Sequence, residues 1–131
     1  MDLQPLVHQL RQSLDGLLAV YLFGSHARDE ARPDSDLDMA IYAGRRLDPE
    51  QLWMLSGSLA AAANCDVDLV DLVAASTVMQ YQIITRGRRL WALDSQASNY
   101  ESFILSEKIE LDAARAGLIA DIRERGYVHG R

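Results

Sequence analysis

The sequence predicts an α+β fold of mixed α/β type, in which a small mixed sheet is flanked by helices and followed by a long C-terminal helix. The 131 residues are enough for one domain with a hydrophobic core. Apolar residues make up 49% of the chain and charged residues 24%, which is ordinary for a globular protein. Short apolar runs of the strand type interleave with segments of helical periodicity, and this order predicts the fold class.

The first half of the chain is predicted to form a helix, two strands and a second helix. Before Gly16, apolar residues recur at helical spacing, at Leu3, Leu6, Val7, Leu10 and Leu14. The runs LLAVYLFG (17–24) and DLDMAIY (36–42) have the composition of strands. Asp48 can cap a helix that has Pro49 at its first position, so the second helix is predicted over 49–63.

A third strand and a third helix are predicted next. The run CDVDLVDL (65–72) has the apolar content of a buried strand. Ser76 can cap a helix that extends to about Thr85, and Gly87 is a plausible stop.

The chain is predicted to end in a short strand and a long helix. RRLWAL (88–93) predicts the fourth strand, and the capping-box spacing of Ser98 and Glu101 predicts a helix over 99–125. The segment DSQAS (94–98) is the candidate joint. It divides the chain into a domain of residues 1–94 and a C-terminal helical region of residues 95–131, which we expect to pack on the domain and to contact a partner.

Charge and composition limit the classes of partner. The formal net charge of −6 argues against a broad nucleic-acid surface. Twelve of the thirteen basic residues are arginines, which suit phosphate or carboxylate, although compositional bias explains this equally well. A single cysteine, Cys65, excludes an intrachain disulfide framework. No apolar run of about 18 residues and no signal peptide are visible, so we expect a cytoplasmic protein without a membrane span.

Aspartates lie inside two of the predicted strands. Alternate residues of a strand share a face, so Asp36 and Asp38 point the same way, and so do Asp66 and Asp68. If the two strands are neighbours, these carboxylates converge at one edge of the sheet. Closely spaced carboxylates suit Mg²⁺, which also binds phosphate oxygens of a substrate. The alternative for a single Asp-x-Asp is a pair of strand-end residues facing water.

A Gly-Ser pair stands where the first strand ends. Gly24 allows the backbone to approach a phosphate closely, and Ser25 with the amides after it can open a helical turn that binds an anion. A phosphate site beside a carboxylate pair is the arrangement that metal-assisted phosphoryl or nucleotidyl transfer needs.

Gly24-Ser25, ten intervening residues and Asp36-Leu37-Asp38 resemble the signature of the DNA-polymerase-β-like nucleotidyltransferases. The small size and the run ARPDSDLDMAI most resemble the minimal nucleotidyltransferase (MNT) antitoxins of HEPN–MNT toxin–antitoxin modules. The resemblance covers about residues 18–92. It implies a nucleotidyltransferase fold and a protein adenylyltransferase that moves AMP from ATP to a tyrosine hydroxyl of its HEPN ribonuclease partner, which silences that toxin.

The resemblance also implies roles for individual residues. Gly24 and Ser25 would bind the nucleotide phosphates, and Asp36 and Asp38 would bind nucleotide and metal, as two Mg²⁺ ions, and act as catalytic residues. Asp68 would be the third catalytic and metal-binding carboxylate. Asp66 shares its face and remains an alternative, whereas Asp71 is expected outside the site.

Several arginines are left with two interpretations. Relatives often have glycine at the position of Asp29, so this chain departs from the family pattern in the loop that carries Arg28 and Arg32. These two arginines either bind phosphate or pair with nearby loop acids. The arginines at 86, 88 and 89 either steer a triphosphate or neutralise a helix end.

Other candidate residues have an ordinary structural interpretation. We interpret His26 as an exposed loop histidine, and the aromatic and sulfur side chains of Trp53, Met54, Tyr81 and Trp91 as core or half-buried.

The last helix carries two apolar stripes. One contains Ile104, Leu111, Leu118 and Ile122, and the other lies on nearly the opposite face, at Leu105, Ile109, Ala113, Ala116 and Ala120. A helix docked on one core needs one stripe, so the second either contacts another chain or is neutral filler.

Two further functions compete with protein adenylylation. One is a binding module that neutralises its partner by contact alone. The other is an antibiotic nucleotidyltransferase, which usually needs a second helical domain that the residues after Ser98 are too few to supply.

Overall fold

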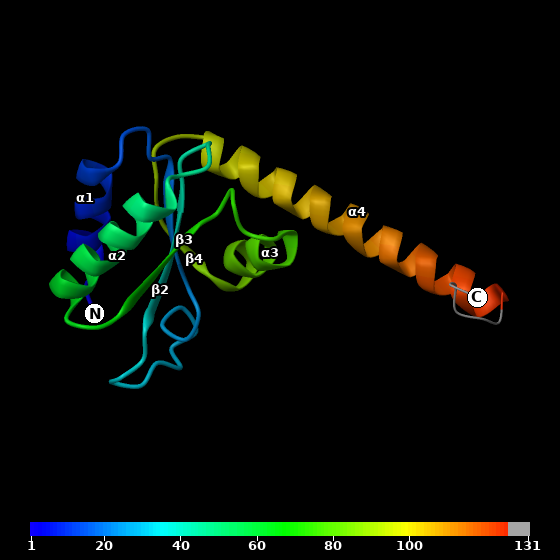
Figure 1. Cartoon of the computed structure of the whole chain (residues 1–131), viewed down its shortest axis with the longest axis horizontal. Helices are drawn as coiled ribbons and strands as arrows, with labels where there is room; N and C mark the ends of the chain where they lie inside the picture. Colours follow the sequence, from blue (N-terminus) through cyan, green and yellow to red (C-terminus); the bar gives the residue numbers. More distant parts are fainter. Residues whose placement is uncertain (126–131) are drawn as a thin grey trace.

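The structure, a computed structural model, describes residues 1–125. Its elements follow the predicted order of helix, strand, strand, helix, strand, helix, strand and helix, which is confirmed (Figure 1). The elements are α1 (Gln4–Ser13), β1 (Ala19–Phe23), β2 (Leu37–Tyr42), α2 (Pro49–Ala63), β3 (Val67–Asp71), α3 (Thr77–Arg86), β4 (Arg88–Ala92) and α4 (Gln96–Arg125).

The four strands form one mixed sheet with the order β3-β2-β1-β4. β1 is antiparallel to both β2 and β4, whereas β2 and β3 run parallel. The parallel pair requires a crossover connection, and α2 supplies it. Since β3 stands at one edge of the sheet, its outer side has no strand partner within residues 1–125.

Helices cover both faces of the sheet, which confirms the predicted architecture (Figure 1). The alternation of each strand divides its side chains between two cores. Leu37, Met39 and Ile41 of β2 belong to the core under α1 and α2. Ala40 and Tyr42 belong to the core under α3 and the first turns of α4, and Asp36 and Asp38 share this second face because they have the same parity.

The predicted caps of the two middle helices are confirmed. The Asp48 side chain accepts a hydrogen bond from the Glu50 amide at 3.2 Å, and Pro49 occupies the first position of α2. The Ser76 hydroxyl accepts from the Met79 amide at 3.2 Å at the start of α3. These side chains satisfy amides that have no partner inside their helices.

The predicted start of the last helix is wrong by three residues. α4 begins at Gln96, whose amide donates to the Asp94 carboxylate at 2.9 Å. Ser98 does not cap the helix, because its hydroxyl accepts from the Arg89 guanidinium at 3.1 Å. The earlier start has a packing reason: Ala97 is fully buried in the second core and belongs to the first turn of α4.

α4 extends well beyond the sheet. Its 30 residues correspond to about 45 Å at 1.5 Å per residue. Among its described side chains only Ala97 and Ile104 are buried, and Leu118 is 57% exposed. Figure 1 shows the second half of the helix projecting away from the other elements. Within the described residues, no helix is long and apolar enough to cross a membrane.

Candidate functional site

The sheet register brings the predicted carboxylates together. In the parallel pair of β2 and β3, Asp38 is the partner of Asp68. Across β2, the other neighbour of Asp38 is Phe23, the last residue of β1. Asp36 lies just before β2 and has the same parity as Asp38. The strands were predicted to be neighbours only conditionally, and the structure meets that condition.

Gly24 brings the end of β1 against this carboxylate group. Its φ of +71° lies in the left-handed region that favours glycine. A Cβ at this position would collide with the carboxylate of Asp38. Glycine is therefore needed here both for the turn and for the close approach of the backbone to Asp38.

The segment after Gly24 forms consecutive tight turns and no regular helix. The Ala27 amide donates to the Gly24 carbonyl at 3.1 Å, and the Glu30 amide donates to the Ser25 carbonyl at 2.9 Å. The predicted helical opening at Ser25 is thus reduced to a turn. The turn still places Ser25 directly after the glycine that faces Asp38.

His26 is half-buried, so its interpretation as an exposed loop histidine is wrong. Its Nε2 lies 3.3 Å from the Ser35 carbonyl, a distance at which the protonated nitrogen donates a hydrogen bond. This contact ties the two ends of the loop between β1 and β2 together beside the carboxylates. The sequence gives no signal for it, because the partner is a main-chain group nine residues away.

The electrostatics of the site centre on Asp38. Burial raises the pKa of its carboxyl above the ordinary value, and the charges of Asp68 and Asp36 raise that pKa further. The positive charges of His26 and Arg28 oppose the shift. The carboxylates are therefore close enough to repel one another, and a bound cation would relieve this repulsion.

The donor set fits a hard cation such as Mg²⁺, since Asp36, Asp38 and Asp68 offer only carboxylate oxygens. Within residues 1–125, however, no three acidic, histidine or cysteine side chains are gathered into a ready-made metal cluster. The mutual repulsion seen at Asp38 opposes such a cluster in the protein alone.

The remaining aspartates of β3 differ in their surroundings. Asp68 faces Asp38 in the register and contributes to its field. Asp66 is exposed and lines one hollow with Asp68 and another with Asp36. Asp71 is buried, and its carboxylate accepts from the amides of Leu47 at 2.9 Å and Val73 at 3.2 Å, so it has a structural role outside the site.

Two of the loop and strand arginines make structural contacts. Arg28 pairs with Glu30 at 3.1 Å, as one of its two interpretations expected. Arg89 donates to Glu101 at 3.0 Å and thereby contacts α4. Arg32 is exposed, and its amide donates to the Ser35 hydroxyl at 2.7 Å.

Among the arginines at 86, 88 and 89, Arg88 lies nearest the Gly24 turn in the strand register. It is paired with Leu22 of β1 and lines a hollow of about 290 Å³ together with His26. Arg86 is exposed in the last turn of α3.

Asp29 adopts a backbone conformation that favours glycine. Its φ of +55° lies in the left-handed region, where a Cβ costs about 1–2 kcal/mol and aspartate is among the few tolerated side chains. The turn therefore keeps its shape in this chain without the glycine.

The expected burial of the four aromatic and sulfur side chains is correct for Trp91 and Tyr81 and wrong for the two that lie on α2. Trp91 and Tyr81 are half-buried, and cations lie over their rings: the Arg11 guanidinium at 4.5 Å and the Lys108 ammonium at 4.9 Å from the ring centroids. Trp53 is 77% exposed and Met54 63% exposed, so neither is core or half-buried.

The comparison with known families decides which nucleotide-handling fold this is. Residues 6–96 match the family described as polymerase beta, nucleotidyltransferase. The chain belongs to this nucleotidyltransferase family. The matched residues contain the Gly24-Ser25 turn and all the strands of the sheet, so the fold and resemblance expected from the sequence are confirmed.

Relatives within the family are more specific. The chain is 36% identical over 117 residues to the protein adenylyltransferase MntA of Shewanella oneidensis. The aligned residues cover 89% of this chain and 84% of that protein. It is also similar to a solved toxin–antitoxin structure with AMP-PNP, at 34% identity and a TM-score of 0.84, covering 94% of this chain and 99% of that one.

A second solved structure to which the chain is similar contains a modified toxin. It contains a tri-AMPylated Shewanella oneidensis HEPN toxin in complex with its MNT antitoxin. The similarity has a TM-score of 0.75 and 34% identity, and it covers 91% of this chain and 93% of that one. The expected resemblance to MNT antitoxins is therefore confirmed.

Proposed function

We propose that this nucleotidyltransferase is the antitoxin of a HEPN–MNT module and transfers AMP from ATP to a tyrosine hydroxyl of its HEPN partner. The observation that carries the proposal is the position of Asp38, which lies between the Gly24 turn on one side and Asp68 on the other. A phosphate-binding turn and an acceptor-side carboxylate thereby meet at one carboxylate. The similarity to MntA and to the AMPylated complex supports the same activity.

The proposed reaction is an in-line displacement at the α-phosphorus of ATP. The tyrosine oxygen forms a bond to the α-phosphorus as the bond to the pyrophosphate oxygen breaks. Asp68 accepts the phenolic proton, and pyrophosphate leaves with its electron pair. An adjacent carboxylate base suits a phenol whose ordinary pKa is about 10.

The proposed roles of the nucleotide-side residues follow from their positions. Ser25 and the backbone at Gly24 bind the phosphates, and Asp36 and Asp38 bind the metal that accompanies the nucleotide. When bound, Mg²⁺ neutralises charge that develops on the phosphates. Arg88 and His26 line the hollow beside the turn, where they can bind outer phosphate oxygens.

α4 is the element that we propose contacts the HEPN partner. Its second half projects from the domain and exposes apolar side chains such as Leu118 and Ile119 (Figure 1). We also propose that the chain divides between residues 94 and 95 into a domain and a C-terminal helical region. A cytoplasmic location is part of the same proposal, since the proposed partner is a ribonuclease.

Label transfer tests the proposed function. The purified protein, Mg²⁺ and its co-encoded HEPN neighbour are mixed with ATP labelled at the α or the γ phosphate. We expect label on the neighbour from the α position only, and the double variant Asp36→Ala/Asp38→Ala should lower transfer by at least about a hundredfold, because several kcal/mol of charge stabilisation is lost.

The controls separate catalysis from binding. The double variant should still form the complex with the neighbour, as judged by size-exclusion chromatography. Neutralisation of the ribonuclease by this variant as complete as by the wild type, without label transfer, would support the non-catalytic binding module instead.

A further inference from the structure

The outer face of α2 carries an apolar surface beside the catalytic strand. Trp53 and Met54 are adjacent in sequence, and both are largely exposed. Large apolar side chains exposed together are unusual on a monomer and typically mark a contact surface. Tryptophan in particular is enriched among the residues that contribute most to protein interfaces.

This surface is hollowed into a groove that reaches Asp68. The groove has a volume of about 450 Å³ and is lined by α2 and by the start of β3, at Trp53, Met54, Ser56, Gly57, Ala60, Asp66, Val67 and Asp68. Gly57 lies one helical turn after Trp53 and leaves open space where a side chain would stand. The groove thus has Trp53 and Asp68 among its lining residues, and β3, which supplies part of its wall, is an edge strand of the sheet.

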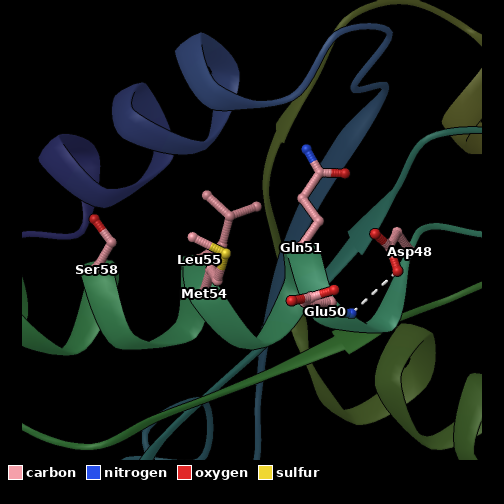
Figure 2. A pocket seen from close by; sticks show the side chains of 6 residues that line it. All are labelled: Asp48, Glu50, Gln51, Met54, Leu55 and Ser58. Atoms are coloured by element: carbon pink, nitrogen blue, oxygen red, sulfur yellow. Dashed lines mark hydrogen bonds between the residues drawn. The ribbon is translucent and has the colours of Figure 1, made fainter.

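A second hollow of about 490 Å³ continues this surface toward α1. Figure 2 shows its lining residues, all on α2 except the N-cap Asp48, with Met54 beside Leu55 in the middle of the row and Ser58 one turn further on. Met54 lines both hollows. Through Met54, the two hollows run along the exposed face of α2 from the flank of α1 to Asp68.

The position of the groove relative to the phosphate turn indicates its occupant. The Gly24 turn lies at the β1 side of Asp38, whereas Asp68 lies at the β3 side. In an in-line displacement the attacking oxygen enters opposite the leaving pyrophosphate. If the nucleotide phosphates occupy the β1 side, then the acceptor hydroxyl arrives from the β3 side, past the edge strand that separates the carboxylate face from α2 and also lines the groove.

We propose that the α2–β3 groove binds the acceptor segment of the partner protein, with Trp53 as the side chain that anchors the residues flanking the modified tyrosine. The proposal rests on the proposed adenylyltransferase function and identifies the surface that selects its protein substrate. The groove combines an apolar wall with the acidic side chains of Asp66 and Asp68. An acceptor segment with apolar and positively charged neighbours around its tyrosine matches this chemistry.

Trp53→Ala tests the anchor. The side chain is mostly in solvent, so the variant should fold as the wild type does. Its affinity for Mg²⁺ and AMP-PNP should remain within about twofold of the wild-type value. The KM for the HEPN partner in AMP transfer should rise about tenfold or more, as expected for an interface anchor. Leu93→Ala is the matched control, because Leu93 is an exposed apolar side chain outside the groove and its removal should leave this KM unchanged.

A pair of substitutions at Gly57 tests the groove by filling it. Both Gly57→Ala and Gly57→Gln improve helix propensity and meet open space, so both should raise or preserve the thermal stability. The methyl group of alanine fills little of the groove and should change KM less than twofold. The glutamine side chain extends into it and should raise the KM for the partner severalfold in a protein that is at least as stable.

The outcomes distinguish the inference from the function on which it rests. An unchanged partner KM in both Trp53→Ala and Gly57→Gln, with normal transfer, contradicts the groove assignment and leaves the adenylyltransferase function intact. An equal loss of nucleotide affinity in these variants also contradicts it, because the groove would then serve the nucleotide. No transfer from wild type, or full transfer by Asp36→Ala/Asp38→Ala, contradicts both.

Discussion

At the scale of single residues, Asp38 is a carboxylate whose charged form is disfavoured by its surroundings. It is half-buried, lies against Gly24 and faces Asp68, and its pKa is raised by burial first and by neighbouring carboxylates second. A carboxyl whose pKa is higher in the folded than in the unfolded protein favours folding when it is protonated. The free energy of unfolding therefore falls as the pH rises through the pKa of the folded state.

Replacing Asp38 with asparagine should separate stability from activity. Without metal at neutral pH, we expect a higher free energy of unfolding for Asp38→Asn than for wild type, because the variant removes a charge that burial and the neighbouring carboxylates both disfavour. The difference should shrink as the pH is lowered and Asp38 becomes protonated. AMP transfer should fall about a hundredfold or more. Denaturant unfolding with a chelator present, repeated from neutral to acidic pH, measures the effect on stability.

Asp15→Asn is the control for this comparison, because Asp15 is exposed and lies between α1 and β1, outside the site. It should change neither stability nor transfer. A lower stability of Asp38→Asn at neutral pH would contradict the repulsion described here.

At the scale of the elements, a partly buried polar contact attaches α4 to the sheet. The Tyr21 hydroxyl donates to the Glu101 carboxylate at 2.7 Å, and the same carboxylate accepts from Arg89 at 3.0 Å. Burial and the adjacent Glu101 raise the pKa of Tyr21, so the phenol remains a donor at neutral pH. Three elements, β1, β4 and α4, thereby share one contact point.

Tyr21→Phe removes this hydroxyl and keeps the ring. We expect a loss of about 1.5–3 kcal/mol in the free energy of unfolding, as for a hydrogen bond to a charged group. Amide exchange should increase first in the opening turns of α4. Thermal unfolding and hydrogen exchange measure the two effects.

Tyr42→Phe is the matched comparison. Tyr42 stacks on Tyr100 with ring centroids 4.4 Å apart, and phenylalanine keeps that stacking. A cost for Tyr42→Phe equal to that for Tyr21→Phe would show that the hydroxyl contact to Glu101 is not what holds α4.

At the scale of the whole molecule, the protein consists of a packed sheet domain and a projecting helix (Figure 1). The first half of α4 packs on the domain through aromatic rings. Tyr100 of α4 stacks with Tyr42 of β2 and with Phe103, and Lys108 lies over the ring of Tyr81 of α3. Beyond them, apolar side chains such as Leu118 and Ile119 are exposed. An apolar surface of this kind on a helix is typical of a segment that is covered in a complex.

A chain that ends at Asp112 should therefore fold and lose its partner. We expect an unchanged melting temperature within a few degrees, because no described side chain after Asp112 is fully buried. The affinity for the HEPN partner should fall about tenfold or more. Calorimetry of the truncated protein and sedimentation of its mixture with the partner measure these effects. A large drop in melting temperature would instead place residues 113–125 in the domain's own packing.

The sequence by itself determined the order of the elements and the two faces of each strand. Apolar periodicity depends on which side chains avoid water, and the Asp48 and Ser76 caps depend on amides within their own turn. These are local causes, so they are readable along the chain. The Gly24-Ser25 and Asp36-Leu37-Asp38 spacing likewise predicted the family, because it encodes one turn followed by one strand.

The tertiary structure decided which residues meet across the chain. Only the parallel register places Asp68 opposite Asp38, and only the close approach of β1 shows that Gly24 lies against that carboxylate. The start of α4 was mispredicted because the burial of Ala97 outweighs the local capping pattern of Ser98. Trp53 was misassigned to the interior for a similar reason: exposure is set by what packs over a helix face, and nothing in the described chain covers this one.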